Sequence, residues 1–116
     1  MRISTWKLNL NVKSLDAADR LFKHCTSLLE TEPRGVLVDT YSKGGFMVCF
    51  SLEHSEQLSW PETVFEILAL SQKIGQGWRV LGSISDNFCG VLSLDAGGTF
   101  SIPGVIWADW DVDKVS

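Results

Sequence analysis

The chain has 116 residues, of which 45% are apolar and 21% are charged, so its composition is that of one ordinary globular domain. This balance argues against disorder, and the apolar stretches are too short for a membrane-spanning helix. The net charge is −4 and the ten Lys and Arg residues are scattered, which argues against the clustered basic surface that nucleic-acid binding requires. We therefore expect a single domain, residues 1–116, that binds neither a nucleic acid nor a membrane.

Two further features predict the compartment. Residues 1–7 lack the apolar core of a signal peptide. The three cysteines, Cys25, Cys49 and Cys89, are widely spaced and form no CxxC pair. An odd number of thiols in apolar surroundings is typical of reduced, at least partly buried cysteines rather than of a disulfide framework. These features favour a cytoplasmic protein.

The chain begins with the pattern of a strand followed by a helix. Apolar and polar residues alternate from Trp6 to Val12, which is typical of a half-buried strand. Apolar residues then recur every three or four positions, the stripe of an amphipathic helix. We expect this helix over 14–31, with Ser14 as its N-cap and Pro33 beyond its end.

A hairpin and a second helix follow. The β-rich runs 36–41 and 46–52 are joined by a turn that contains two glycines, which indicates a hairpin. Ser59 and Glu62 have the spacing of a capping box, so a helix is expected over 60–75. Its apolar face is expected to comprise Val64, Phe65, Ile67, Leu68 and Ile74.

Three more strands complete the domain, at about 78–85, 88–94 and 100–112, with an interruption at Pro103-Gly104. The order strand, helix, two strands, helix and three strands predicts the α+β class. Two helices are expected on one face of a mostly antiparallel sheet. The first six elements match the split βαβ, ferredoxin-like arrangement, to which an extra C-terminal hairpin is added.

The last strand carries an unusual charge pattern. Residues 86–116 hold five of the fourteen acidic residues and one of the ten basic residues, so they carry the whole net charge. Residues 105–113 alternate strictly between two faces. The inner face is expected to hold Ile106, Ala108, Trp110 and Val112, and the outer face Trp107, Asp109, Asp111 and Asp113.

A row of like charges beside a tryptophan suggests a surface for a basic protein partner, because the acids attract it and the ring anchors it. The alternative is a solvated acidic face without a partner. An EF-hand is excluded, since the glycine required at its sixth position is replaced by Lys114. The partner-binding residues we expect are Trp107, Asp109, Asp111, Asp113, Asp95 and Asp86.

No catalytic, metal-binding or cofactor-binding motif appears, so we expect no enzyme activity, no metal and no cofactor. His24 and His54 are the only histidines, and we interpret His54 as a surface residue in a polar link. An enzyme would need His54 to meet a carboxylate such as Glu53, Asp86 or Asp95, together with a distant serine.

In these features the chain resembles the small immunity proteins of bacterial toxin systems, including those of contact-dependent growth inhibition. The resemblance is one of kind: an acidic cytoplasmic α+β domain without catalytic residues that carries an acidic, aromatic strand. It implies a toxin inhibitor that covers the active site of a cognate toxin, often a basic nuclease, with Asp109, Asp111 and Asp113 in place of phosphates. An alternative is a small-molecule-binding regulatory module of ferredoxin-like type, which often binds its ligand at a dimer interface.

Overall fold

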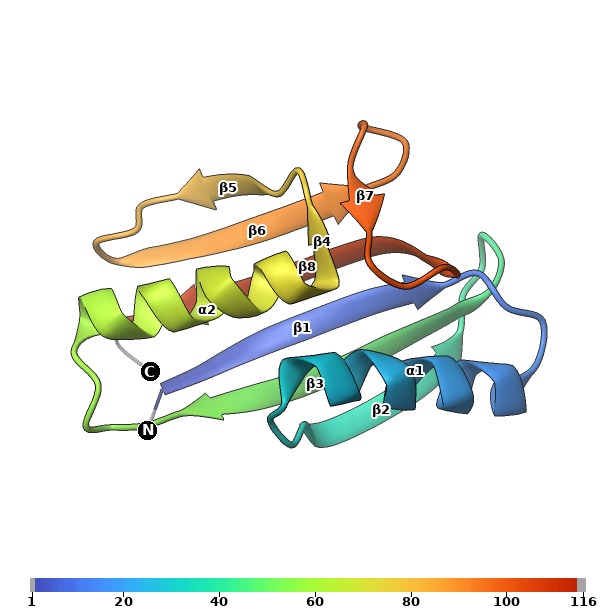
Figure 1. The fold of residues 1–116 in the computed structure, drawn as a ribbon, viewed down its shortest axis with the longest axis horizontal. Helices are drawn as coiled ribbons and strands as arrows, with labels where there is room; N and C mark the ends of the chain where they lie inside the picture. The colour runs from blue at the N-terminus through green and yellow to red at the C-terminus, as the bar shows by residue number, and fades with distance from the viewer. Residues whose placement is uncertain (1, 115–116) are drawn as a thin grey trace.

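The computed structural model describes residues 2–114, which form two helices and eight strands (Figure 1). The predicted helices and the predicted hairpin are all present close to their expected boundaries. In chain order the elements are β1 (Arg2–Leu10), α1 (Leu15–Leu29), β2 (Arg34–Thr40), β3 (Phe46–His54), α2 (Trp60–Ile74), β4 (Gly75–Gln76), β5 (Arg79–Gly82), β6 (Asn87–Ser93), β7 (Thr99–Phe100) and β8 (Val105–Asp113).

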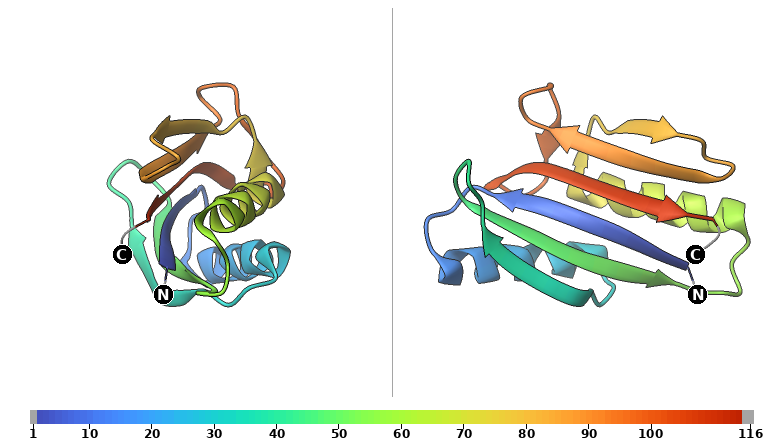
Figure 2. Two further views of the ribbon diagram at one scale, coloured as in Figure 1. Left: turned by 90° about the vertical axis from the view of Figure 1, so that its left-hand side faces the viewer. Right: turned by 180° about the vertical axis from the view of Figure 1, so that it is seen from behind.

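Six strands form one sheet in the order β2-β3-β1-β8-β6-β5, and every neighbouring pair is antiparallel. The short strands β4 and β7 pair separately. Both helices lie on one face of the large sheet, and the view from behind shows strands that no helix covers (Figure 2). The α+β class is confirmed, and the order of elements is consistent with a split βαβ arrangement. The C-terminal strand β8 takes the place beside β1, and β6 and β5 extend the sheet beyond it.

Local signals in the sequence fix the starts of both helices. The hydroxyl of Ser14 accepts a hydrogen bond from the amide of Ala17 at 3.1 Å. At the start of α2, the Ser59 hydroxyl accepts from the Glu62 amide and the Glu62 carboxylate accepts from the Ser59 amide, which completes the predicted capping box. Helix α1 ends at its C-cap, Glu30, which adopts the left-handed conformation with φ 56° and donates its amide to the Thr26 carbonyl.

The core lies between the helices and the sheet and is rich in aromatic rings. Trp6 and Trp110 are fully buried at neighbouring positions of β1 and β8, with ring centroids 6.1 Å apart. Phe88 packs edge-on against Trp110 at 5.1 Å. Gly90 lies opposite Trp110, and a Cβ atom at Gly90 would stand 2.6 Å from the indole ring. The absence of a side chain at this position therefore makes room for the tryptophan.

The predicted apolar face of α2 is wrong at Phe65, whose surface is 74% exposed. The face that meets the sheet follows the steps of three and four residues that a helix of 3.6 residues per turn requires. Phe65 lies two positions beyond Thr63 and therefore points about 200° away from it. The buried residues of this helix are Trp60, Thr63, Ile67, Leu70, Ser71 and Ile74.

Within residues 2–114, neither helix has the length and apolar character needed to cross a bilayer.

Candidate functional site

The acidic strand is a central strand of the sheet rather than an edge. β8 pairs with β1 on one side and with β6 on the other. Its inward residues Ala108, Trp110 and Val112 are buried under the helices. Trp107, Asp109, Asp111 and Asp113 alternate with them, so they lie on the opposite face, which we call the open face. The predicted separation of the two faces is confirmed for these seven residues.

The alternation fails at Ile106, which was expected to point inward. Asn9 pairs with Trp107 but the next residue of β1, Leu10, pairs with Val105, so Ile106 is an extra residue in a β-bulge. The bulge buries Val105 in the core and leaves Ile106 half-buried in the wall of a cavity. The assumption of strict alternation therefore assigned one residue too many, Ile106, to the inner face.

The three acids of β8 are not equivalent. Asp109 is half-buried and lies directly across from Lys7 of β1, whereas Asp111 and Asp113 are exposed. Burial raises the pKa of Asp109; the Lys7 ammonium opposes this rise and the Asp111 carboxylate adds to it. The open face is therefore less acidic than the three carboxylates of β8 suggest, because Lys7 lies beside Asp109.

Trp107 and Asp95 meet at one end of the open face. They line a cavity of about 490 Å³ together with residues of β1, β3, the β2–β3 turn and the β6–β7 loop. Trp107 is half-buried and Asp95 is exposed in the loop. The cavity wall includes Asn9, Tyr41, Lys43, Met47, Asp95 and Trp107.

Asp86 lies at the other end of β6, in the β5–β6 turn, far from Asp95. Its backbone carbonyl accepts a hydrogen bond from the Lys114 amide at 2.9 Å, which places it beside the end of β8 near Asp113. Asp111 and Asp113 line a shallower hollow of about 430 Å³ there. The six predicted partner-binding residues therefore follow β8 from one end of the sheet to the other, with Trp107 and Asp95 close together and Asp86 separate from them.

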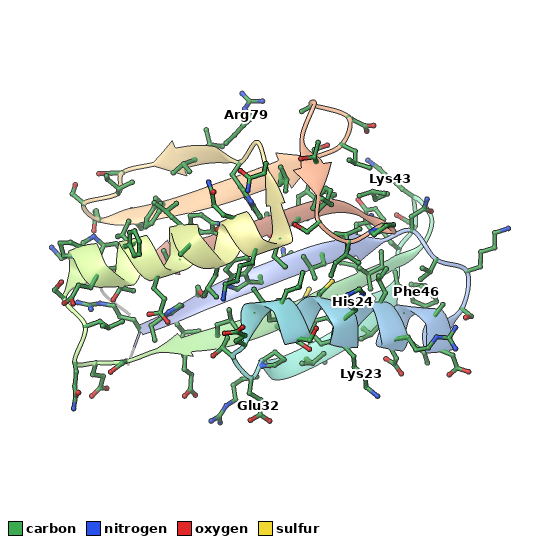
Figure 3. All side chains as sticks on the ribbon, viewed as in Figure 1. Lys23, His24, Glu32, Lys43, Phe46 and Arg79 are labelled. Atoms are coloured by element: carbon green, nitrogen blue, oxygen red, sulfur yellow. The ribbon has the colours of Figure 1, made fainter. Side chains whose placement is uncertain are left out.

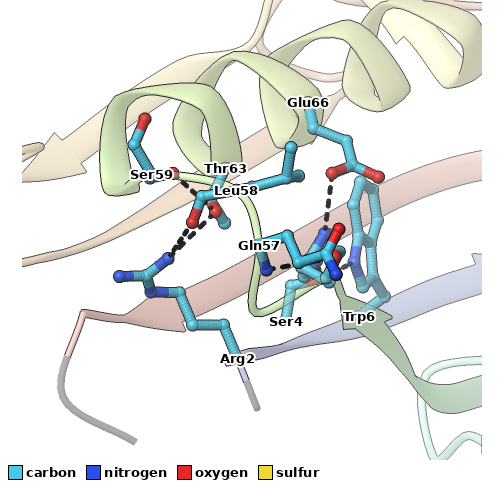
Figure 4. Close-up of polar contacts among 10 residues, drawn as sticks. Arg2, Ser4, Trp6, Gln57, Leu58, Ser59, Thr63 and Glu66 are labelled. Carbon is cyan, nitrogen blue, oxygen red and sulfur yellow. Dashed lines mark hydrogen bonds and ion pairs between the residues drawn. The ribbon is translucent and has the colours of Figure 1, made fainter.

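The prediction that His54 is a surface residue is wrong. Its side chain is 1% exposed and lies at the end of β3, beside Glu66 of α2. Figure 4 labels Ser4, Trp6 and Glu66, the residues that surround it. The pattern that could have revealed this is the alternation along β3, in which Val48, Phe50, Leu52 and His54 are all buried. Because Glu53, Ser55 and Glu56 flank His54 in the sequence, we assigned it to a polar link instead of to the inward-facing residues of β3.

His54 belongs to a buried chain of polar groups. Trp6 Nε1 donates to Ser4 Oγ at 2.8 Å, and Ser4 Oγ lies 2.7 Å from His54 Nε2. Because the Glu66 carboxylate beside Nδ1 can only accept, we assign the ring proton to Nδ1, and Nε2 then accepts a hydrogen bond from the Ser4 hydroxyl. Nδ1 faces Glu66 Oε2 of α2 at 3.6 Å. Burial lowers the pKa of His54, and the Glu66 carboxylate opposes this effect.

Serine, histidine and glutamate also form the catalytic triads of some hydrolases. The carboxylate beside His54 is Glu66, not Glu53, Asp86 or Asp95, which the sequence had suggested. Ser4 is 0% exposed and its oxygen already accepts from Trp6, so a substrate carbonyl has no path to it in this conformation. The arrangement instead joins β1, β3 and α2. Nearby, Arg2 donates to the Leu58 carbonyl at 3.0 Å and lies 5.4 Å from the centre of the Trp60 ring, which ties β1 to the start of the same helix.

Among residues 2–114, no three His, Cys, Asp or Glu side chains come together as a possible metal site. All three cysteines are free; Cys25 is buried and the other two are half-buried.

No protein-family model matches the chain, and no match was found among curated proteins or solved structures.

Proposed function

We propose that this chain is a non-catalytic protein-binding domain that recognises a basic protein through the open face of its sheet. The observation that carries the proposal is the charge on this face. Of the acids that give the chain its net charge, Asp109, Asp111 and Asp113 lie along β8 on the face that no helix covers. Asp86 and Asp95 lie in the turns before and after β6, near the two ends of β8. Trp107 lies half-exposed in the same row and supplies an aromatic anchor.

The resemblance to immunity proteins supports a cognate bacterial toxin as this partner, with a basic nuclease as the first kind to test. In such a complex Asp109 and Asp111 take the place of nucleic-acid phosphates in the toxin's active site. Asp109 is already half-buried, so a partner that covers it removes its remaining water, whereas the exposed Asp113 near the end of β8 contributes less. We also propose a cytoplasmic location, because three widely spaced cysteines without a CxxC pair are typical of a reducing compartment.

The test uses the double variant Asp109→Asn with Asp111→Asn and the matched control Phe65→Ser. Phe65 is the most exposed large apolar side chain that α2 presents on the opposite side of the molecule. A basic protein captured from the native host is identified, and its affinity for each variant is measured at several salt concentrations. We expect the double variant to lose at least tenfold in affinity, since a central desolvated acid is worth about 2–5 kcal/mol, while Phe65→Ser has no effect.

The salt dependence gives a second measure of the same surface. Raising the salt to about 0.1 M shortens the Debye length to roughly 10 Å, so association with the unchanged chain slows and the double variant responds less. We expect the double variant to keep its fold. Burial raises the pKa of Asp109, so the charged carboxylate destabilises the folded chain near neutral pH, and the neutral Asn removes this cost. Unchanged affinity and unchanged salt dependence in the double variant would refute the proposal, as would a loss confined to Phe65→Ser.

A second candidate function is a small-molecule-binding regulatory module, favoured by the cavity beside Trp107. Its volume of about 490 Å³ lies within the range of about 300–1,000 Å³ that ligand sites occupy. A metabolite that raises the unfolding temperature of the purified chain and shifts the Trp107 indole resonance would support this function over protein binding.

A further inference from the structure

One polar group in the cavity beside Trp107 lacks a partner. Asn9 is 6% exposed, and its side-chain oxygen Oδ1 makes no hydrogen bond to any residue in 2–114. Its cross-strand neighbours are Met47, which has no donor, and Trp107, whose indole N–H makes no bond to it. Buried carbonyl oxygens almost always have a hydrogen-bond donor, so this oxygen in the cavity wall is available to a donor that enters the cavity.

The surroundings of Asn9 indicate what that donor carries. The carboxylate of Asp95 and the side chain of Asn11 add further acceptors to the cavity wall. The rings of Trp107 and Tyr41 supply aromatic surface. A ligand that suits this wall has several donors and a positive charge, and it is flat enough to stack on an indole ring.

We propose that this cavity binds a guanidinium group, presented by an arginine side chain of the basic partner, with Asn9 Oδ1 and Asp95 as acceptors and Trp107 as the stacking surface. The guanidinium group is planar, has five N–H donors and no acceptor, and stacks on aromatic rings. An ammonium group has the charge but lacks the flat shape. This inference rests on the proposed function and names the chemistry by which the partner is recognised.

Lys43 makes the test sensitive to the sign of the ligand's charge. It is exposed on the β2–β3 turn and lines the same cavity; Figure 3 labels it on the right-hand side of the molecule. Its ammonium repels a cation and attracts an anion. The substitution Lys43→Gln therefore strengthens the binding of a guanidinium group, whereas it weakens the binding of a carboxylate or phosphate.

The first experiment uses N-acetyl-arginine amide as the probe and follows the side-chain amide of Asn9 and the indole N–H of Trp107 by NMR. Two matched probes separate charge from shape: N-acetyl-citrulline amide has nearly the same shape without the charge, and N-acetyl-lysine amide has the charge without the plane. We expect saturable shifts at Asn9 and Trp107 with the arginine probe and at least tenfold weaker binding of the other two. Equal binding of citrulline, or no shift at Asn9, would overturn the inference.

The second experiment compares three variants with the same probe. Asn9→Leu removes the acceptor at similar volume, and Asp95→Asn removes the charge; each is expected to weaken the arginine probe about tenfold. Asn9→Leu also removes an unbonded polar atom from the interior, so its urea midpoint is expected to rise or stay unchanged. A loss of probe binding thus cannot be attributed to unfolding. Inorganic phosphate is the opposing probe: if it binds in place of the arginine probe, with Lys43→Gln weakening and Asp95→Asn strengthening its binding, the cavity is an anion site and the inference is wrong.

The captured partner separates this inference from the proposed function. If Asp109→Asn with Asp111→Asn lowers the affinity for the partner but Asn9→Leu does not, the open face is an interface and the cavity does not hold an arginine of the partner. If the arginine probe binds but neither Asn9→Leu nor the acidic double variant affects the partner, the cavity accepts free guanidinium compounds and the proposed function fails. Loss of partner affinity in both variants supports both proposals.

Discussion

Replacing Ser4 by Ala tests whether the polar chain of Ser4, His54 and the partly exposed Glu66 supports the fold. The substitution removes one hydroxyl and leaves two groups without a partner, the indole N–H of Trp6 and Nε2 of His54. Both side chains are at most 1% exposed, so water cannot replace the lost hydrogen bonds. Each buried unsatisfied group costs about 1–3 kcal/mol, which predicts a loss of roughly 2–6 kcal/mol in the free energy of unfolding. That is a large part of the ~5–15 kcal/mol that stabilises an ordinary domain.

The assay is urea unfolding at pH 7 followed by tryptophan fluorescence. Ser51→Ala is the matched control, because Ser51 lies on β3 opposite Thr5, on the open face, where it is half-buried. The control is expected to change the stability by no more than about 0.5 kcal/mol. A Ser4→Ala variant as stable as Ser51→Ala would show that the hydroxyl contributes nothing to the fold.

A double variant sharpens the test. His54→Leu alone leaves the Ser4 hydroxyl without its acceptor, and Ser4→Ala with His54→Leu leaves only the Trp6 N–H unbonded. We therefore expect the double variant to lose less stability than the two single losses added together, with a coupling of about 0.5–3 kcal/mol. Strictly additive losses would contradict a hydrogen bond between these residues. A catalytic role predicts a different pattern, in which Ser4→Ala abolishes an activity and leaves the stability unchanged.

Three further predictions concern the same core. Burial lowers the pKa of His54 in the folded chain below its ordinary value of 6.5. As the pH falls, the unfolded chain therefore binds a proton at this histidine before the folded chain does. Stability is therefore expected to fall as the pH drops below about 6.5 towards the folded-state pKa, and His54→Gln should remove this part of the slope in urea titrations. Gly90→Ala forces a methyl group against the Trp110 ring and is expected to lower the urea-derived stability by about 1–3 kcal/mol; an unchanged midpoint would contradict this packing. Burial raises the pKa of the Cys25 thiol to about 11, so in native thiol titration at pH 8 it should react more slowly than the other two cysteines, and equal rates would contradict its burial.

The sequence predicted the local elements because their signals are local. The capping box at Ser59 and the N-cap at Ser14 involve residues three positions apart, and the helical and strand periods are read within single segments. The two faces of β8 were predictable for the same reason, apart from the bulge at Ile106. That bulge arises from pairing with β1, about a hundred positions away in the chain, so no nearby residue signals it.

The long-range features were missed for a related physical reason. The strand that lies beside β1 is β8, and this choice depends on the packing of the whole sheet rather than on any single segment. The cavity that joins Asn9, Lys43, Asp95 and Trp107 requires two loops from distant parts of the chain to meet at one end of the sheet. His54 was misjudged because its polar neighbours in the sequence were weighed above the inward alternation that it continues.

The central position of β8 decides how a partner can bind to it. The backbone of β8 is paired with β1 and β6 along most of its length, so a partner strand cannot add to it, and recognition there depends on side chains alone. Addition of a strand is confined to the sheet edges: β2, whose pairing with β3 is interrupted by a register shift, and β5, which has only four residues. A complex that forms through the open face should therefore respond to substitutions of Trp107, Asp109 and Asp111 and tolerate a proline in the edge strand β5. The reverse result, sensitivity to a proline at Val80 without sensitivity to the acids, would place the interface at the edge of the sheet.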